Sequence, residues 1–266
     1  MDQYLIVEPS NGKVVMGSAP SMYEVGEIVP DAMPELKGVM PRLYTVEHWE
    51  RQLPVIKNIA ARDIEKGLAP RVCALVETDA DWDILMKHIG DTLALPRQWG
   101  EGYSVFRFYD PRVFSHLGWL LREDQMGRIF GPIVRWSYYS GQSWVTVHRP
   151  EAALAETLAL TDRQWTVLRE LPLLEQALKA IRDAGEPIDD RMPRKLEILF
   201  AKGNEFGLSR DDKVVFAVQA ALVSPNIDRH PAVAAALKRQ DSYAETTAKW
   251  TDEDWARIAF ELPQYV

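Results

Sequence analysis

The strand and the helix that decide the fold lie within residues 71–90, RVCALVETDADWDILMKHIG. This stretch opens with the apolar run Arg71–Glu77, and a continuous apolar run is typical of a strand covered on both faces. Thr78 predicts the N-cap of the next helix, with Asp81 in the place that Glu takes in a capping box. Helical spacing then puts on one face the side chains of Trp82, Leu85, Ile89 and Leu93. A strand that leads into an amphipathic helix predicts a sheet with helices packed on it.

The residues that follow repeat this order of strand and helix. A second strand is predicted at Tyr103–Tyr109, and Asp110 and Pro111 are residue types that cap and start a helix. A hairpin is predicted for two aromatic and β-branched runs, Ile133–Tyr139 and Ser143–His148. We therefore expect a mixed β-sheet that ends in antiparallel edge strands.

Upstream of residue 71 the pattern is less regular. A short strand is predicted at Tyr4–Val7, and a helix is predicted at Pro54–Glu65, because Pro suits the first helical position. The stretch from Gly17 to Pro41 contains four prolines and does not favour any long element.

From about residue 151 onward the pattern is almost entirely helical. Thr161 and Gln164 form a capping box, Pro172 is expected to kink or split the helix that follows, and Gly203 is expected to end a later one. Further helices are predicted at Pro193–Lys202, Arg210–Val223, Pro231–Arg239 and Asp252–Glu261. The predicted fold class is α/β, with an N-terminal domain (residues 1–150) of mixed sheet and packed helices and an all-helical C-terminal domain (residues 151–266).

The composition argues against several classes of function. The chain has 266 residues and a formal net charge of −8, so it lacks the basic excess that binding to nucleic acid requires. No leader-like N-terminal stretch and no apolar run long enough for a membrane span are present, which predicts a cytoplasmic protein without a membrane partner. The single cysteine, Cys73, lies in the apolar run and is interpreted as an inert core residue.

The sequence proposes no metal site and no cofactor. The five histidines are scattered, and none pairs with another at helical spacing. Phosphate-binding loops, the dinucleotide glycine fingerprint and the serine nucleophile elbow are not found in the sequence.

The densest polar feature is the segment Arg107–Arg112, which has two interpretations. In the functional one, Asp110 between two arginines ends a strand of an open sheet, and His116 lies near it, which permits acid–base chemistry or anion recognition. In the structural one, Asp110 caps the helix, Pro111 starts it, and Arg107 or Arg112 neutralises the cap.

The aromatic residues of the hairpin also allow two interpretations. Trp and Tyr are favoured in protein interfaces, so these side chains are candidates for binding a partner. Alternation along a strand equally predicts that every second residue of the hairpin faces the core. The residues concerned are Trp136, Tyr138, Tyr139 and Trp144.

The same region carries a family resemblance. The run VFRFYDPRVF at residues 105–114 resembles the signature of the type VI secretion adaptor family, long catalogued as a domain of unknown function. The family follows this signature with a helix and a Phe-Gly-Pro-Ile segment before a tryptophan, and here Phe130–Ile133 and Trp136 take those places. The resemblance is dense from about residue 72 to residue 145, is looser toward residue 4, and includes the helix Trp82–Gly90.

The resemblance implies a non-enzymatic adaptor or chaperone that binds an effector toxin and promotes its loading onto the VgrG spike protein. No catalytic residue comes with it, and the signature positions Arg107, Asp110, Pro111 and Arg112 are expected to be architectural. Two alternatives remain: a small enzyme that acts on an anionic substrate through Asp110 and His116, and an immunity protein that binds a toxin to block it.

Overall fold

The computed structural model describes residues 1–14, 22–151, 155, 157–238 and 242–265. The chain divides into two compact units, residues 1–165 and residues 166–266. The first unit contains a β-sheet with packed helices and the second is helical, which confirms the predicted α/β class. The division falls in a helix, later than the expected boundary at residues 150/151.

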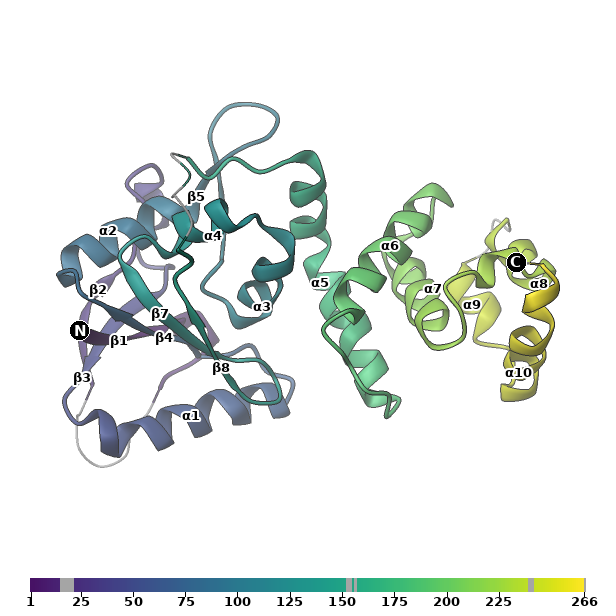
Figure 1. Cartoon of the computed structure of the whole chain (residues 1–266), viewed down its shortest axis with the longest axis horizontal. Coiled ribbons are helices and arrows are strands. Elements are labelled where there is room, and N and C mark those ends of the chain that lie inside the picture. The colour runs from purple at the N-terminus through teal and green to yellow at the C-terminus, as the bar shows by residue number, and fades with distance from the viewer. Residues whose placement is uncertain (15–21, 152–154, 156, 239–241, 266) are drawn as a thin grey trace. The chain divides into compact units, whose positions relative to one another are not determined.

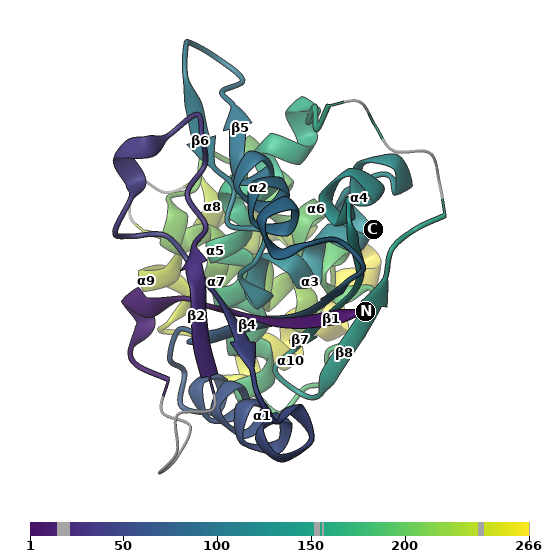
Figure 2. The same ribbon diagram turned by 90° about the vertical axis from the view of Figure 1, so that its left-hand side faces the viewer.

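The first unit is built on one six-stranded sheet in the order β2-β3-β1-β4-β7-β8 (Figures 1 and 2). Its strands are β1 (Asp2–Val7), β2 (Met22–Glu27), β3 (Arg42–Val46), β4 (Val72–Thr78), β7 (Ile133–Tyr139) and β8 (Trp144–His148). A separate small sheet pairs β5 (Ala94–Pro96) with β6 (Tyr103–Val105). The helices are α1 (Trp49–Glu65), α2 (Trp82–Leu93), α3 (Pro111–Leu120) and α4 (Glu123–Phe130), with short 3-10 turns at Pro9–Asn11 and Pro34–Leu36.

All strand pairs in the described part of the chain are antiparallel, so the expected mixed strand directions are wrong. Strand–helix–strand order gives a parallel pair only when the connection crosses to the opposite end of the sheet before the next strand begins. Between β4 and β7 the chain instead runs through three helices and the β5–β6 hairpin, and it re-enters the sheet at the end where β4 finishes, so that Thr78 is paired with Ile133.

Helices cover both faces of the sheet (Figure 1). On one face, α1 packs through Ile56 and Ala60 against the inward side chains of β1 and β4. On the other face lie α2, α3 and α4, and the Phe114 ring of α3 stacks on Trp136 of β7 with the ring centroids 4.7 Å apart. Trp82 is an exception to the predicted apolar face of α2, because half of its side chain is exposed.

Several predicted local features were placed wrongly. Only Tyr103–Val105 of the predicted strand Tyr103–Tyr109 is a strand, and it lies outside the main sheet. The helix α1 begins at Trp49, so Pro54 lies inside the helix and not at its start. Asp81, and not Thr78, is the N-cap of α2, because Thr78 is the last residue of β4 and its hydroxyl donates to the carbonyl of Pro132.

Two strands that the sequence did not predict lie before α1: β2 is inside the proline-rich stretch and β3 follows it directly. They pair with each other, with a register shift between Glu24 and Gly26. Glycine weakens the interior of a strand, but Gly26 lies at the β-bulge of the edge strand β2, where glycine is common. Residues 152–154 and 156, which follow the expected boundary at residues 150/151, lie outside the described residues.

The second unit consists of the rest of α5 (Asp162–Asp183) followed by further helices. These are α6 (Met192–Glu205), α7 (Arg210–Leu222), α8 (Pro231–Leu237), α9 (Tyr243–Thr247) and α10 (Asp252–Glu261), with 3-10 turns at Ile227–Arg229 and Leu262–Gln264. The helix α6 packs on α7, and α7 and α8 pack on α9. The short α9 was not predicted, since five residues show little periodicity.

Two expectations for the second unit were wrong. The helix α5 continues through Pro172 and is not split there. Gly203 does not end α6, because it is buried inside that helix, where an added Cβ would lie 2.9 Å from Cγ of Lys213. The left-handed glycine that follows the helix is Gly207, with φ +68°.

Candidate functional site

The segment Arg107–Arg112 is a turn that leads into α3. The carboxylate of Asp110 caps this helix by accepting a hydrogen bond from the backbone amide of Arg112 at 2.9 Å, and Pro111 takes the first helical position. The guanidinium of Arg112 donates to both carboxylate oxygens of Asp110, at 3.0 and 2.6 Å. The predicted cap is therefore present, although the residue that precedes it ends a turn and not a strand of the sheet.

A buried carboxylate, Glu8, anchors the same turn to the start of the chain. The hydroxyl of Tyr109 donates to Oε2 of Glu8 at 2.7 Å, and the hydroxyl of Ser10 donates to Oε1 at 2.7 Å. Glu8 is 2% exposed, and Nη2 of the half-exposed Arg107 lies 4.0 Å from its Oε2. Burial, reinforced by the bond to the Glu8 carboxylate, raises the pKa of Tyr109 far above its ordinary value.

A second buried carboxylate, Asp63, fixes the end of α1 to the beginning of β4. Its oxygens accept from Nε and Nη2 of Arg71 at 3.0 and 2.7 Å, and from the backbone amide of Arg71 at 3.0 Å. The carbonyl of Arg71 in turn accepts from the backbone amide of Glu8 at 2.9 Å. The two carboxylates are thus connected through one residue, and a buried ion pair with its oxygens bonded in this way is costly to break.

Asp110 and His116 do not form the acid–base pair that the functional interpretation requires. Both are buried, and the oxygens of Asp110 bond to Arg112. Nδ1 of His116 accepts a hydrogen bond from the indole nitrogen of Trp119 at 3.1 Å, one turn further along α3. These contacts fit the structural interpretation of the segment.

The hairpin aromatics also belong mainly to the core. Trp136 is fully buried against Phe108 and Phe114, and Tyr138 and Tyr139 are buried on opposite faces of β7. Trp144 is partly exposed and packs against Tyr139, with Nζ of Lys57 5.6 Å from its ring centroid. Three of the four candidates for partner binding are therefore packing residues, and alternation along the strand explains their placement.

The segment Phe130–Ile133 is shaped around a histidine. Gly131 has φ +49°, and a Cβ built on it would lie 2.2 Å from Cε1 of His88. Nε2 of His88 lies 2.9 Å from the carbonyl oxygen of Ile129, which requires a proton on that nitrogen because a carbonyl only accepts. Burial lowers the pKa of His88, which favours the neutral ring. Glycine is needed here both for its backbone conformation and for the room its missing side chain leaves.

Cys73 is buried in β4, as expected. Its Sγ lies 3.7 Å from the carbonyl oxygen of Pro70, and burial raises the pKa of the thiol well above its ordinary value. A thiol in this environment stays protonated and unreactive.

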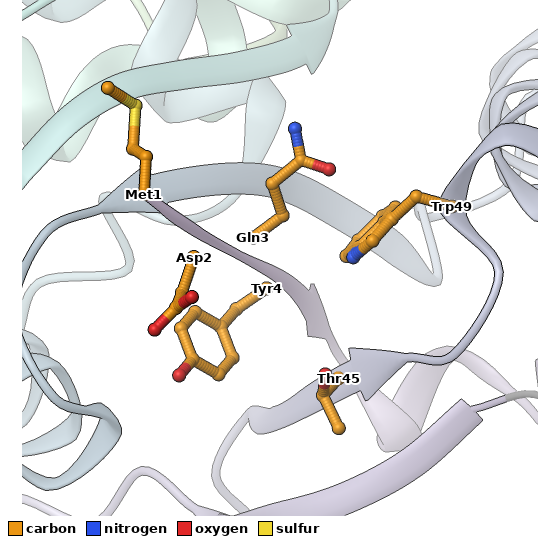
Figure 3. A pocket seen from close by; sticks show the side chains of 6 residues that line it. All are labelled: Met1, Asp2, Gln3, Tyr4, Thr45 and Trp49. Atoms are coloured by element: carbon orange, nitrogen blue, oxygen red, sulfur yellow. The ribbon is translucent and has the colours of Figure 1, made fainter.

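Two hollows lie on the surface of the first unit. One, of about 430 Å³, lies beside the first residues of β1, between Gln3 and Trp49 (Figure 3). The other, of about 550 Å³, is lined by Arg97, Arg128, Trp165 and the chain between Thr157 and Leu160. Among the described residues no group of three or more His, Cys, Asp or Glu side chains is placed to hold a metal ion, and no helix has the length and apolarity that crossing a bilayer demands.

Comparison of the chain with protein-family models, with curated proteins and with solved structures gave no match. Glu8 was missed because it follows the strand Tyr4–Val7 as an apparent turn residue, and its partner Tyr109 lies 101 positions further along the chain. A carboxylate directly before Pro at the end of an apolar strand is the one local signal for it.

Proposed function

We propose that this protein is a non-enzymatic adaptor that binds a type VI secretion effector in the cytoplasm and promotes its loading onto the VgrG spike protein. The observation that carries the proposal is that the residues of the family resemblance meet in one core. The ring of Phe114 from the run at residues 105–114 stacks on Trp136 and lies 6.2 Å from Phe130, edge to face. Gly131 accommodates His88 from the helix α2.

This arrangement supports the proposal because it gives the resemblance a physical reason. Residues that pack together restrict one another, so a pattern of this kind is expected to persist in proteins that share a fold. The polar residues Asp110 and Arg112 serve the same core by capping α3. The proposal thus rests on the packing of the residues that carry the resemblance.

Exposed aromatic side chains supply candidate contacts in each unit. In the first unit Trp99 is 68% exposed at the turn between β5 and β6, and in the second unit Phe260 of α10 is 82% exposed. Large aromatic side chains contribute much of the binding energy in protein interfaces. An adaptor must contact both an effector and a spike protein, and two units that each expose an aromatic side chain suit that task.

The test is deletion of the gene in a secreting strain, with the effector toxin and the tube protein of the secretion machine measured in the medium. We expect toxin export to fall while tube export continues, and export to return when the intact gene is restored. Toxin export at the wild-type level in the deletion strain would contradict the adaptor proposal. Unchanged export together with killing of the deletion strain by its sisters would instead identify an immunity protein.

A binding test accompanies the deletion. The adaptor and the effector are co-expressed, and size-exclusion chromatography is used to detect a complex. We expect a complex that is reversible, because cargo must be released at the spike and very tight binding would release it too slowly.

A further inference from the structure

The two edges of the six-stranded sheet differ in how well they are protected. At one edge, β2 carries a register shift at Gly26, and Glu24 on this strand binds Arg42 of β3 at 2.8 Å. A bulge and inward-bonded charges of this kind prevent another strand from pairing with the edge.

The opposite edge, β8, has none of these devices. Its sequence, WVTVH at residues 144–148, contains no Lys, Glu, Asp or Pro and is rich in β-branched residues. In the described part of the chain β8 pairs with β7 alone and without a register shift (Figure 2). A regular, uncharged edge strand is a template for a further strand.

The hydrogen-bonding pattern of the hairpin shows which backbone groups point outward. In an antiparallel pair only every second residue exchanges backbone bonds with its partner. The amide of Arg149 donates to the carbonyl of Val134 at 3.0 Å, and the amide of Ser140 donates to the carbonyl of Ser143 at 2.9 Å.

Counting along the register from these bonded pairs places Val145 and Val147 at positions bonded to β7. The N–H and C=O groups of Trp144, Thr146 and His148 therefore point away from β7, at the open side of the strand. Three donors and three acceptors spaced two residues apart match the backbone of an extended peptide.

The charges beside β8 indicate the character of that peptide. Lys57 lies over Trp144 at one end of the strand, and Arg149 follows the strand at the other end. Among the ion pairs of the described residues neither cation is bonded to a carboxylate, and the guanidinium of Arg149 donates to the carbonyl of Gly131. Two cations that flank a neutral strand favour an acidic partner.

The same charges disfavour a second copy of this chain. Antiparallel pairing of β8 with itself about Thr146 would set Trp144 opposite His148 of the other copy. Lys57 of one copy would then approach Arg149 of the other, and like charges at an interface are unfavourable.

We propose that β8 binds an extended, acidic segment of a partner protein as a seventh strand of the sheet, bonded to the backbone of Trp144, Thr146 and His148. Taking this partner to be the effector rests on the proposed function, whereas the strand addition itself rests on the edge alone.

The experiment uses the full chain and two synthetic peptides blocked at both ends, one of alternating valine and glutamate and one of alternating valine and lysine. Amide hydrogen exchange, resolved to single residues, is measured with each peptide at millimolar concentration. We expect the glutamate peptide to slow exchange at Trp144, Thr146 and His148 and to leave Val145 and Val147 unchanged. The lysine peptide should bind at least about tenfold more weakly, the loss that corresponds to about 1.4 kcal/mol.

A matched pair of variants isolates the backbone donor. Thr146→Pro removes the outward N–H and keeps the bonds to β7, because proline is tolerated at an edge position whose amide faces outward. Thr146→Val loses the same bond from Oγ1 to Ser137 but keeps the amide. We expect Thr146→Pro to weaken binding of the glutamate peptide at least about tenfold and Thr146→Val to change it less than about twofold.

Several results would overturn the proposal. The glutamate peptide could fail to slow amide exchange, the two peptides could bind equally well, or the two Thr146 variants could bind the glutamate peptide equally well. Slower exchange that depends on protein concentration alone would mean that β8 pairs with a second copy of the chain.

Measurements of secretion separate this proposal from the proposed adaptor function. If deletion stops toxin export but Thr146→Pro exports normally, the effector does not use this edge and the adaptor proposal stands. If the glutamate peptide binds as expected but deletion of the gene leaves toxin export unchanged, strand addition at β8 is supported and the adaptor function is contradicted.

Discussion

Each unit of this protein contains one fully buried tyrosine that joins separate elements, and the two differ in the charge of the group they bind. Tyr109 donates to the carboxylate of Glu8, and Tyr243 donates to the side-chain oxygen of Gln219, both at 2.7 Å. The first contact spans 101 positions of the chain and the second spans 24. Hydrogen bonds to charged groups stabilise a fold more than neutral ones.

The comparison indicates where long-range order is concentrated. In the first unit, one buried charge ties the start of the chain to the turn before α3, so the sheet and its helices depend on each other. In the second unit, contacts join helices that are near in sequence, as between Phe216 of α7 and Tyr243 of α9, whose ring centroids are 5.8 Å apart. Loss of one such contact should therefore lower the free energy of unfolding of the first unit more than that of the second.

The largest expected difference concerns two glycines that leave no room for a further side-chain atom. Gly131→Ala should destabilise the first unit by about 2–5 kcal/mol, because the new methyl meets the ring of His88 and the backbone is strained. Gly203→Ala should stay within about 1 kcal/mol of wild type, since the side chain of Lys213 can shift and alanine favours the helix. Hydrogen exchange of β4 and of α6 measures the two effects separately. The double variant His88→Ala, Gly131→Ala should recover part of the loss, and no recovery would exclude the clash as its cause.

The tyrosines themselves provide the next comparison. Tyr109→Phe should cost about 1.5–3 kcal/mol in the first unit, and Tyr243→Phe about 0.5–1.5 kcal/mol in the second, because only the first removes a bond to a charge. Urea unfolding, followed by hydrogen exchange in each unit, checks which of the two variants loses more stability. A larger loss in the second unit would contradict the idea that the buried charge of Glu8 decides the difference.

Alkaline pH should weaken both units through the same tyrosines. Burial raises the pKa of Tyr109 and of Tyr243 above the unfolded value of about 10, so the fold favours the protonated phenols. This stability is complete below about pH 10 and is lost as pH rises beyond it, by about 1.4 kcal/mol per pH unit for each group. In Tyr109→Phe the loss of stability of the first unit between pH 10 and pH 12 should be correspondingly less steep. An unchanged slope would show that Tyr109 is already ionised in the fold.

The smallest effects are expected at two helix caps. Asp110→Ala in the first unit and Ser209→Ala in the second each remove a side chain that accepts from a backbone amide at a helix start, and each should cost about 0.5–2 kcal/mol. Asp110→Ala should lie toward the upper end, because Arg112 also loses its partner. Thermal unfolding checks both. A chemical activity that Asp110→Asn abolishes at unchanged stability would support the enzyme alternative.

The elements that could be predicted from the sequence are those that neighbouring residues decide. The apolar run at β4, the start of α3 at Asp110 and Pro111, and the β7–β8 hairpin were all predicted within a residue or two. Caps and hairpins act over a few residues, so their signals are complete in the local sequence.

Features that depend on distant residues could not be predicted in this way. Phe106–Tyr109 has the composition of a strand, yet it forms a turn because Phe108 packs on Trp136 and Tyr109 reaches Glu8. Trp82 has the spacing of a core residue, yet it is half exposed at the first turn of α2. Propensity is overruled in both places by where the rest of the chain lies.

The candidate site was predicted in part. Asp110 and Arg112 were identified, and the structural interpretation of them agrees with their contacts, whereas Glu8 was missed. The hairpin aromatics were identified as residues of interest, but three of the four serve the core. The outward N–H and C=O groups of β8 could not be predicted from residue types, because every residue except proline carries both groups.

The sequence by itself determined that this chain forms a sheet with packed helices followed by a helical region, and where most of the helices begin. Hydrophobic period and capping residues carry that information locally. Only the tertiary structure decided the strand order, the burial of Glu8 and of Trp136, and which edge of the sheet is left open. These depend on which surfaces meet after the chain has folded, and a pattern read along the chain does not contain that pairing.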